Sequence, residues 1–182
     1  MINTKHYQID GLFSFENRVF SDDRGEFFEA FNQIEFENIF GKKINFVQDN
    51  ISQSKKGVLR GLHFQNPPFA QAKLVRVIKG SVLDVAVDLR KDSPTYGQHQ
   101  KIILSGNNYV NFFIPRGFAH GFVTLEEGTI FTYKCDNSYN RESEESLIWN
   151  DKDLGINWEI NQPLLSPKDE VAGSFSEFKS PF

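Results

Sequence analysis

Short segments of alternating apolar and polar residues run through most of this chain, with turn residues such as glycine between them. The clearest segment lies at 82–89, where large aliphatic side chains occupy every second position and therefore one face of a strand. Residues 73–79 form a second such segment, and Gly80 and Ser81 stand between the two. This arrangement predicts a β-hairpin closed by a tight turn.

Most of the remaining pattern also predicts strands, and one segment, 33–40, predicts a helix. Asn32 can cap that helix, Glu35 follows three residues later, and Gly41 can end it. Further strands are expected at 46–52, 58–64, 100–104, 111–114, 121–124 and 129–135. So many short strands favour a mainly β fold, an antiparallel sandwich or barrel, in a single domain spanning residues 1–182.

The composition narrows the classes of protein to consider. An aromatic content of 14%, with 19 Phe and one Met, suits a sheet-rich core. A net charge of -4 gives no general basic field that would indicate binding to nucleic acid or to an anionic membrane, so an anionic ligand would need a local cluster of cations. Cys135 is the single cysteine, which excludes an internal disulfide and fits a reducing compartment. We therefore expect a cytoplasmic protein with no nucleic-acid partner and no membrane partner.

Residues 57–65 place two polar side chains, Arg60 and His63, in an otherwise apolar strand. Histidine can take up and return a proton near neutral pH, although a histidine in a strand can equally be a hydrogen-bonded core residue. Because the two side chains are three positions apart, a regular strand would point them to opposite faces. We therefore expect a local irregularity at Gly61 that lets both serve one site.

Other side chains on the predicted strands also carry useful chemistry. The Lys73 ammonium could stabilise a developing oxyanion, whereas Arg76, three positions later, is expected on the opposite, solvated face. A phenol such as Tyr133 or Tyr139 can donate a proton to a carbanion, or can be an ordinary core or rim residue. Phe27 can likewise be a stacking platform or a core residue, and composition does not decide between these roles.

Residues 115–122 form a proline–glycine turn that leads into a strand carrying His120. This segment resembles the second metal-binding motif of cupin barrels. Metal cupins usually add a His-x-His pair and a glutamate from an earlier strand. The corresponding segments here, 73–77 and 82–85, contain no histidine. The sequence therefore predicts no metal centre.

Taken in order, the motifs resemble those of the dTDP-4-dehydrorhamnose 3,5-epimerases, a metal-free, cupin-like family of nucleotide-sugar enzymes. Each motif alone is a weak signal, but their number and order are specific. They lie at 22–29, 48–52, 57–65, 71–77, 84–90, 115–122, 148–151 and 165–169. The resemblance implies an antiparallel double-stranded β-helix, or jelly roll, and a tail after about residue 170 that packs on the barrel. It also implies a homodimer with exchanged N-terminal strands.

The reaction implied by the resemblance is the inversion of C3 and C5 of dTDP-4-dehydro-6-deoxy-D-glucose, giving dTDP-4-dehydro-L-rhamnose without a cofactor. Carried over by motif, His63 is the base, Asp169 orients it, Tyr133 is the acid, and Lys73 stabilises the enolate oxygen. The implied diphosphate ligands are Arg24 and Arg60, and the implied neighbours of the thymine are Phe27 and Tyr139. The other implied substrate-binding residues are Glu29, Gln48, Asp49, Asn50, His120, Glu144 and Lys168.

Three other functions stay open at this point. A relative that inverts only C3 or only C5 of a related dTDP-keto-sugar would share most of these motifs. A non-catalytic module that binds nucleotide sugars would bind dTDP without exchanging protons with solvent. A metal-dependent cupin oxygenase would carry stoichiometric iron.

Overall fold

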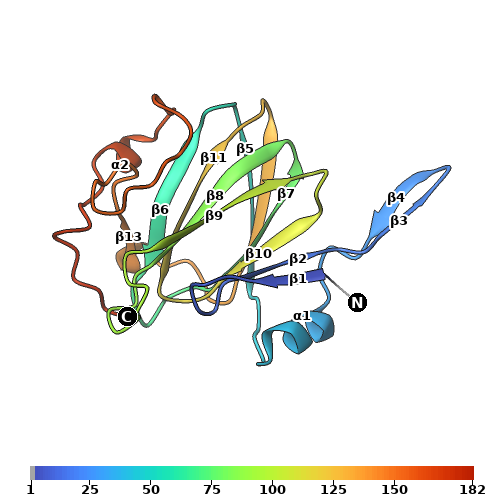
Figure 1. Ribbon diagram of the computed structural model, residues 1–182, viewed down its shortest axis with the longest axis horizontal. Coiled ribbons are helices and arrows are strands. Elements are labelled where there is room, and N and C mark those ends of the chain that lie inside the picture. The colour runs from blue at the N-terminus through green and yellow to red at the C-terminus, as the bar shows by residue number, and fades with distance from the viewer. Residues whose placement is uncertain (1–2) are drawn as a thin grey trace.

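The computed structural model describes residues 3–182, and its main feature is a pair of antiparallel sheets that face each other (Figure 1). The first sheet has six strands in the order β1 (Asn3–His6), β2 (Phe13–Glu16), β10 (Val110–Ile114), β7 (Lys73–Lys79), β12 (Thr129–Cys135) and β5 (Gln48–Ser54). The second has five strands in the order β13 (Glu144–Ser146), β6 (Leu59–Gln65), β11 (Phe118–Thr124), β8 (Ser81–Asp88) and β9 (His99–Ser105). The mainly β fold of the jelly-roll type is confirmed.

The predicted helix is confirmed with the same bounds, as α1 (Gln33–Phe40). The Asn32 side chain accepts hydrogen bonds from the backbone N–H groups of Ile34 and Glu35, and Gly41 ends the helix with φ 73°. Phe36 is fully buried and packs α1 against the outer face of the six-stranded sheet, where it contacts Phe113. A second helix, α2 (Pro167–Glu170), and a 3₁₀ turn, η1 (Arg141–Ser143), lie near the other end of the chain.

The predicted hairpin between 73–79 and 82–89 is wrong, although both of its strands exist. β7 pairs with β10 and β12, whereas β8 pairs with β11 and β9 in the opposite sheet. The turn at Gly80, with φ 78°, therefore carries the chain from one sheet to the other. A strand pattern with a tight turn specifies a reversal of direction, but it does not specify which strands become hydrogen-bonded neighbours.

The alternation in β8 reflects two different apolar layers rather than one buried and one solvated face. Every residue of β8 is buried. Val82 and Ala86 face the other sheet and pack in the core between the sheets, where Phe122 and Phe131 stack with ring centroids 4.1 Å apart. Residues of the opposite parity face outward, where the C-terminal segment covers them. That outer layer includes Leu83, Val85, Val87, Leu154, Trp158, Phe175, Phe178 and Phe182.

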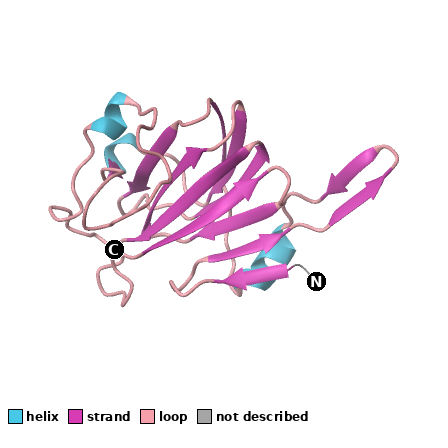
Figure 2. Cartoon of the chain, turned by 45° about the horizontal axis from the view of Figure 1, so that its top comes forward, coloured by secondary structure: helices cyan, strands magenta, loops and turns pink. Residues whose placement is uncertain are grey.

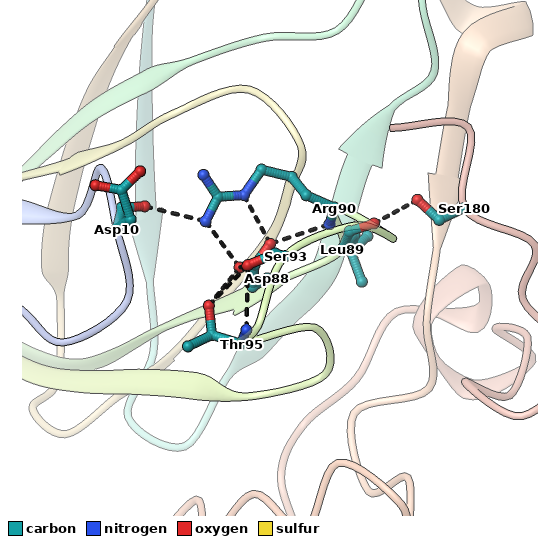
Figure 3. Close-up of polar contacts among 7 residues, drawn as sticks. All are labelled: Asp10, Asp88, Leu89, Arg90, Ser93, Thr95 and Ser180. Atoms are coloured by element: carbon teal, nitrogen blue, oxygen red, sulfur yellow. Dashed lines mark hydrogen bonds and ion pairs between the residues drawn. The ribbon is translucent and has the colours of Figure 1, made fainter.

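A hydrogen-bonded cluster fixes the end of β8 (Figure 3). The buried carboxylate of Asp88 accepts hydrogen bonds from the Arg90 guanidinium at 2.8 Å, from the Ser93 hydroxyl at 2.6 Å and from the Thr95 hydroxyl at 2.7 Å. Burial alone would raise the pKa of Asp88, but these donors outweigh it and hold the pKa below its ordinary value. Ser180 donates to the Leu89 carbonyl next to this cluster, so the tail is tied to the same end of the barrel.

One pair of strands, β3 (Val19–Asp22) and β4 (Gly25–Phe28), belongs to neither large sheet. This hairpin projects away from the two sheets at the side opposite α2 (Figures 1 and 2). Its cross-strand pair of Phe20 and Phe27 is 51% and 69% exposed. A two-stranded hairpin is at best marginally stable in water. We therefore expect the exposed rings of this hairpin to pack against another protein surface.

Sequence patterns predict the long strands to within a few residues and miss the shortest ones. β1 to β4 and β13 each contain only three or four residues, too few for a period of two to stand out.

Within residues 3–182, neither helix is long and apolar enough to cross a bilayer.

Candidate active site

Polar side chains line one end of the space between the sheets, next to the apolar core. A bulge in β6 points the side chains of both Arg60 and His63 into this space. His63 lies opposite His120 of β11, but Arg60 lies opposite Phe122, so three steps on β6 match two on β11. The bulge contains Gly61, with φ 120° and a cis peptide to Leu62. The irregularity expected at Gly61 is confirmed.

His63 and Asp169 form a close pair. The His63 Nε2 lies 2.5 Å from the Asp169 Oδ1, and their side chains are 30% and 3% exposed. Ser166 caps α2 and also donates its hydroxyl to the Asp169 Oδ2 at 2.7 Å. Burial alone would raise the pKa of Asp169, but the hydrogen bonds from His63 and Ser166 keep it below its ordinary value. A charged carboxylate therefore orients an imidazole whose ring stays accessible.

A second histidine–carboxylate pair lies beside the first. His120 faces His63 across β6 and β11, and its Nε2 lies 2.9 Å from the Asp84 Oδ2. This pair is closed off, because His120 is 5% exposed and Asp84 is 0% exposed. Burial lowers the pKa of His120, and the charges of Lys73 and His63 lower it further despite the opposing effect of Asp84. His120 is therefore neutral at pH 7.

Lys73 and Tyr133 enter the same space from the six-stranded sheet. The Lys73 Nζ lies 5.9 Å from the centre of the Tyr133 ring. Burial raises the pKa of Tyr133, with Cys135 and Glu144 acting in the same direction, so the phenol keeps its proton at neutral pH. Burial lowers the pKa of Lys73, and Cys135, Asp84 and Glu144 oppose that effect. Arg76 lies on the outer face of the sheet, stacked over Phe28 as expected from parity.

An ion pair and a phenol close the rim near β13. The Lys168 Nζ lies 2.7 Å from the Glu144 Oε2, and the Tyr139 hydroxyl donates to the same carboxylate at 2.9 Å. Burial alone would raise the pKa of Glu144, but these two donors outweigh it and lower the pKa. Glu144 is therefore a fixed anion within electrostatic reach of His63.

Strand β5 contributes amide groups to the site. Gln48 Nε2 donates to the Asn50 Oδ1 at 3.0 Å, and Gln48 Oε1 accepts from the backbone of Tyr139. Asp49 lies between them and points to the outer face, where it forms an ion pair with Lys134 at 2.9 Å. The structure therefore brings Gln48 and Asn50 to the site, but not the side chain of Asp49.

Arg60 reaches the same space at its open edge, where its guanidinium donates to the Ser54 hydroxyl at 3.2 Å. The remaining three residues implied by the sequence, Arg24, Phe27 and Glu29, do not join the site of their own chain. Arg24 sits at the tip of the projecting hairpin, paired with Asp22, and its side chain is 89% exposed. Phe27 and Glu29 line a separate cavity of about 360 Å³ against α1.

Sequence reasoning missed three residues that support the site. Asp84 anchors His120, Ser166 anchors Asp169, and Ser54 anchors Arg60. Asp84 had a signal, because an aspartate in a strand as apolar as 82–87 needs a partner. Ser166 had one too, because a serine three positions before Asp169 is typical of a helix N-cap. Ser54 had none, since its contact with Arg60 joins two different strands.

The arrangement can move protons. An accessible imidazole oriented by a carboxylate can act as a base, a neutral phenol can act as an acid, and a nearby ammonium can stabilise negative charge on oxygen. Among residues 3–182, no group of three or more His, Cys, Asp or Glu side chains is arranged to hold a metal ion.

Known proteins are similar to this chain in sequence and in fold. The profile of the dTDP-4-dehydrorhamnose 3,5-epimerase family matches residues 6–177. The dTDP-4-dehydrorhamnose 3,5-epimerase of Salmonella typhimurium is 54% identical over 165 residues, which cover 90% of this chain and 90% of that protein.

Two solved structures extend the comparison. The Legionella pneumophila dTDP-6-deoxy-D-glucose-3,5-epimerase, in complex with dTDP-4-keto-L-rhamnose, has a TM-score of 0.95 at 46% identity and covers 98% of this chain and 95% of its own. A 3′-monoepimerase of Streptomyces bikiniensis, in complex with dTDP-quinovose, has a TM-score of 0.89 at 33% identity and covers 93% and 86%. With sequence and fold agreeing over almost the full length, the chain belongs to the dTDP-4-dehydrorhamnose 3,5-epimerase family.

Proposed function

We propose that the chain inverts C3 and C5 of dTDP-4-dehydro-6-deoxy-D-glucose to give dTDP-4-dehydro-L-rhamnose, a step in dTDP-L-rhamnose biosynthesis. The observation that carries this function is the accessible His63–Asp169 pair beside Tyr133 and Lys73. The family membership and the dTDP-4-keto-L-rhamnose bound by the Legionella relative support the choice of substrate. The single, unpaired Cys135 suits a reducing compartment, so we place the reaction in the cytoplasm.

The substrate's own ketone makes the chemistry possible. The C4 carbonyl acidifies the hydrogens at C3 and C5, because the carbanion left behind is delocalised as an enolate. His63 removes the proton from one face of the ring, and Tyr133 returns a proton from the other face. Lys73 stabilises the negative charge on O4 of the enolate. Once His63 has released its proton to solvent and Tyr133 has taken one up, the same exchange at the second carbon completes the product.

The remaining residues hold the nucleotide sugar. Arg60 binds the diphosphate in this proposal, and its contact with Ser54 at the open edge of the site supports that role. The other groups that bind substrate on the same chain are Gln48, Asn50, His120, Tyr139, Glu144 and Lys168. Asp49 is left out of this set, because its side chain pairs with Lys134 on the opposite face of β5.

The active unit in this proposal is a homodimer in which each chain lends its β3–β4 hairpin to the other. Arg24, Phe27 and Glu29 are implied in substrate binding, yet they lie on or next to the hairpin that projects from their own barrel (Figure 1). β1 and β2 pair within the sheet of their own chain, and this supports assigning the exchange to the hairpin. Docked on a second copy, Phe27 loses its exposed surface and Arg24 supplies a cation for the diphosphate.

Mixing two inactive variants tests this exchange. We expect Arg24→Ala and His63→Ala to be nearly inactive alone. Unfolded and refolded together in equal amounts, they should recover about a quarter of wild-type activity, because half of the dimers are then mixed and contain one intact site in two. If each hairpin serves its own barrel, the mixture stays inactive.

Proton exchange with solvent tests the reaction itself. In heavy water, the wild-type protein should introduce deuterium at both C3 and C5 of the keto-sugar, as measured by mass spectrometry and NMR. Label at a single carbon would instead indicate a monoepimerase like the Streptomyces bikiniensis relative. Binding of dTDP without any label would indicate a binding module.

A further inference from the structure

Asp84 is a buried carboxylate that the proposed reaction does not use. It lies in the middle of β8 with 0% of its surface exposed, among apolar neighbours. One oxygen, Oδ2, lies 2.9 Å from the His120 Nε2. The other oxygen, Oδ1, has no hydrogen-bond partner among the described residues. A buried carboxylate oxygen without a hydrogen bond lowers the stability of the fold, because its desolvation is not compensated. We therefore expect Asp84 to have a functional role that offsets this loss of stability.

The position of Asp84 suggests what that role is. β8 and β7 lie in opposite sheets, and the parity of each strand points Asp84 and Lys73 into the space between the sheets. No ion pair within 4.0 Å is formed by Lys73 among the residues that the structure describes. The ammonium therefore has a nearby anion without being neutralised by direct contact, and its hydrogen bonds stay available to a ligand.

We propose that Asp84 is a positioning residue of the epimerase: its carboxylate holds Lys73 as a charged ammonium and fixes His120 in one orientation. This inference rests on the proposed function, because Lys73 stabilises an enolate only when it carries a proton. The Asp84 Oδ2 accepts the Nε2 proton of a neutral His120, which leaves the His120 Nδ1 as an acceptor.

The effect on Lys73 follows from the groups that surround it. Burial inside the barrel lowers the pKa of Lys73, and the negative charge of Asp84 opposes this effect. Removing that negative charge should therefore lower the pKa of Lys73 further. The other titratable groups that face Lys73 and Asp84 are His63, His120, Tyr133, Cys135 and Glu144.

The test is the pH dependence of Asp84→Asn, a change that keeps the shape and removes the charge. Deprotonation of Lys73 with rising pH ends activity, so a lower Lys73 pKa moves the alkaline limb of the kcat profile to lower pH. We expect that limb to move to lower pH, with KM changed less than kcat. In the Lys73→Arg variant the guanidinium keeps its proton over the whole pH range. The double variant Lys73→Arg/Asp84→Asn should therefore have the same alkaline limb as Lys73→Arg alone.

Asp88→Asn is the matched control, because Asp88 is equally buried on the same strand but belongs to the cluster with Arg90. It should lower the melting temperature without moving the alkaline limb. An unshifted limb in folded Asp84→Asn, or an equal shift in Asp88→Asn, overturns the proposal. So does failure of both Asp84→Asn and Asp84→Ser to fold, which would assign Asp84 to stability alone. A wild-type protein that exchanges no deuterium would refute the epimerase function instead.

Discussion

Replacing His63 with alanine should lower the rate of deuterium exchange at both C3 and C5 by about 10²–10⁴-fold, the usual contribution of a positioned acid or base. The same side chain removes both protons in the proposed mechanism, so the two carbons should lose label together. The measurement is the time course of label at each carbon in heavy water, followed by NMR.

His6→Ala is a suitable control, because His6 is an exposed histidine on β1, where its ring contacts Phe13. It should exchange at the wild-type rate. Since the His63 side chain is 30% exposed, its loss should leave the fold and dTDP binding largely intact. Exchange that persists at one carbon in His63→Ala would show that a different base serves that carbon.

Replacing Gly61 with alanine should destabilise the protein by more than about 4 kcal/mol, which is at the extreme of single substitutions. A Cβ at this position would lie 2.6 Å from the Gly121 Cα and 2.6 Å from the His120 carbonyl oxygen. Both contacts are with the backbone of the neighbouring strand β11, so no side chain can move aside to relieve them. Urea unfolding followed by circular dichroism measures the loss.

Gly25→Ala separates this steric effect from the backbone effect. Gly25 has φ 123°, close to the 120° of Gly61, but a Cβ there meets nothing within 4 Å. It should therefore cost only about 1–2 kcal/mol for the unfavourable φ. Equal losses in the two variants would mean that the approach of β6 to β11 is not what requires glycine at position 61.

The sequence predicts those parts of this protein that depend on neighbours along the chain. Asn32 and Gly41 define α1 because capping is local, and Gly61 could be identified because two functional side chains had to share a face. The pairing of β7 and β8 could not be predicted, because it depends on which distant strands complete each sheet.

The site shows the same division. Residue chemistry alone left His63, Tyr133 and Lys73 with structural alternatives, and resemblance to a family was needed to assign their roles. His63 and Asp169 lie 106 positions apart, so only the fold brings them together. The outward direction of Asp49 follows from strand parity, yet a motif that reads 48–50 as one block hides it.

The carboxylate that orients the base arrives from outside both sheets. Asp169 belongs to α2, which lies against β6 within the C-terminal segment that covers the outer layer. A barrel whose final layer has not yet docked can have every strand in place and still lack an oriented base. Catalytic competence therefore requires the C-terminal segment to be docked, and turnover reports on the completed molecule rather than on its sheets.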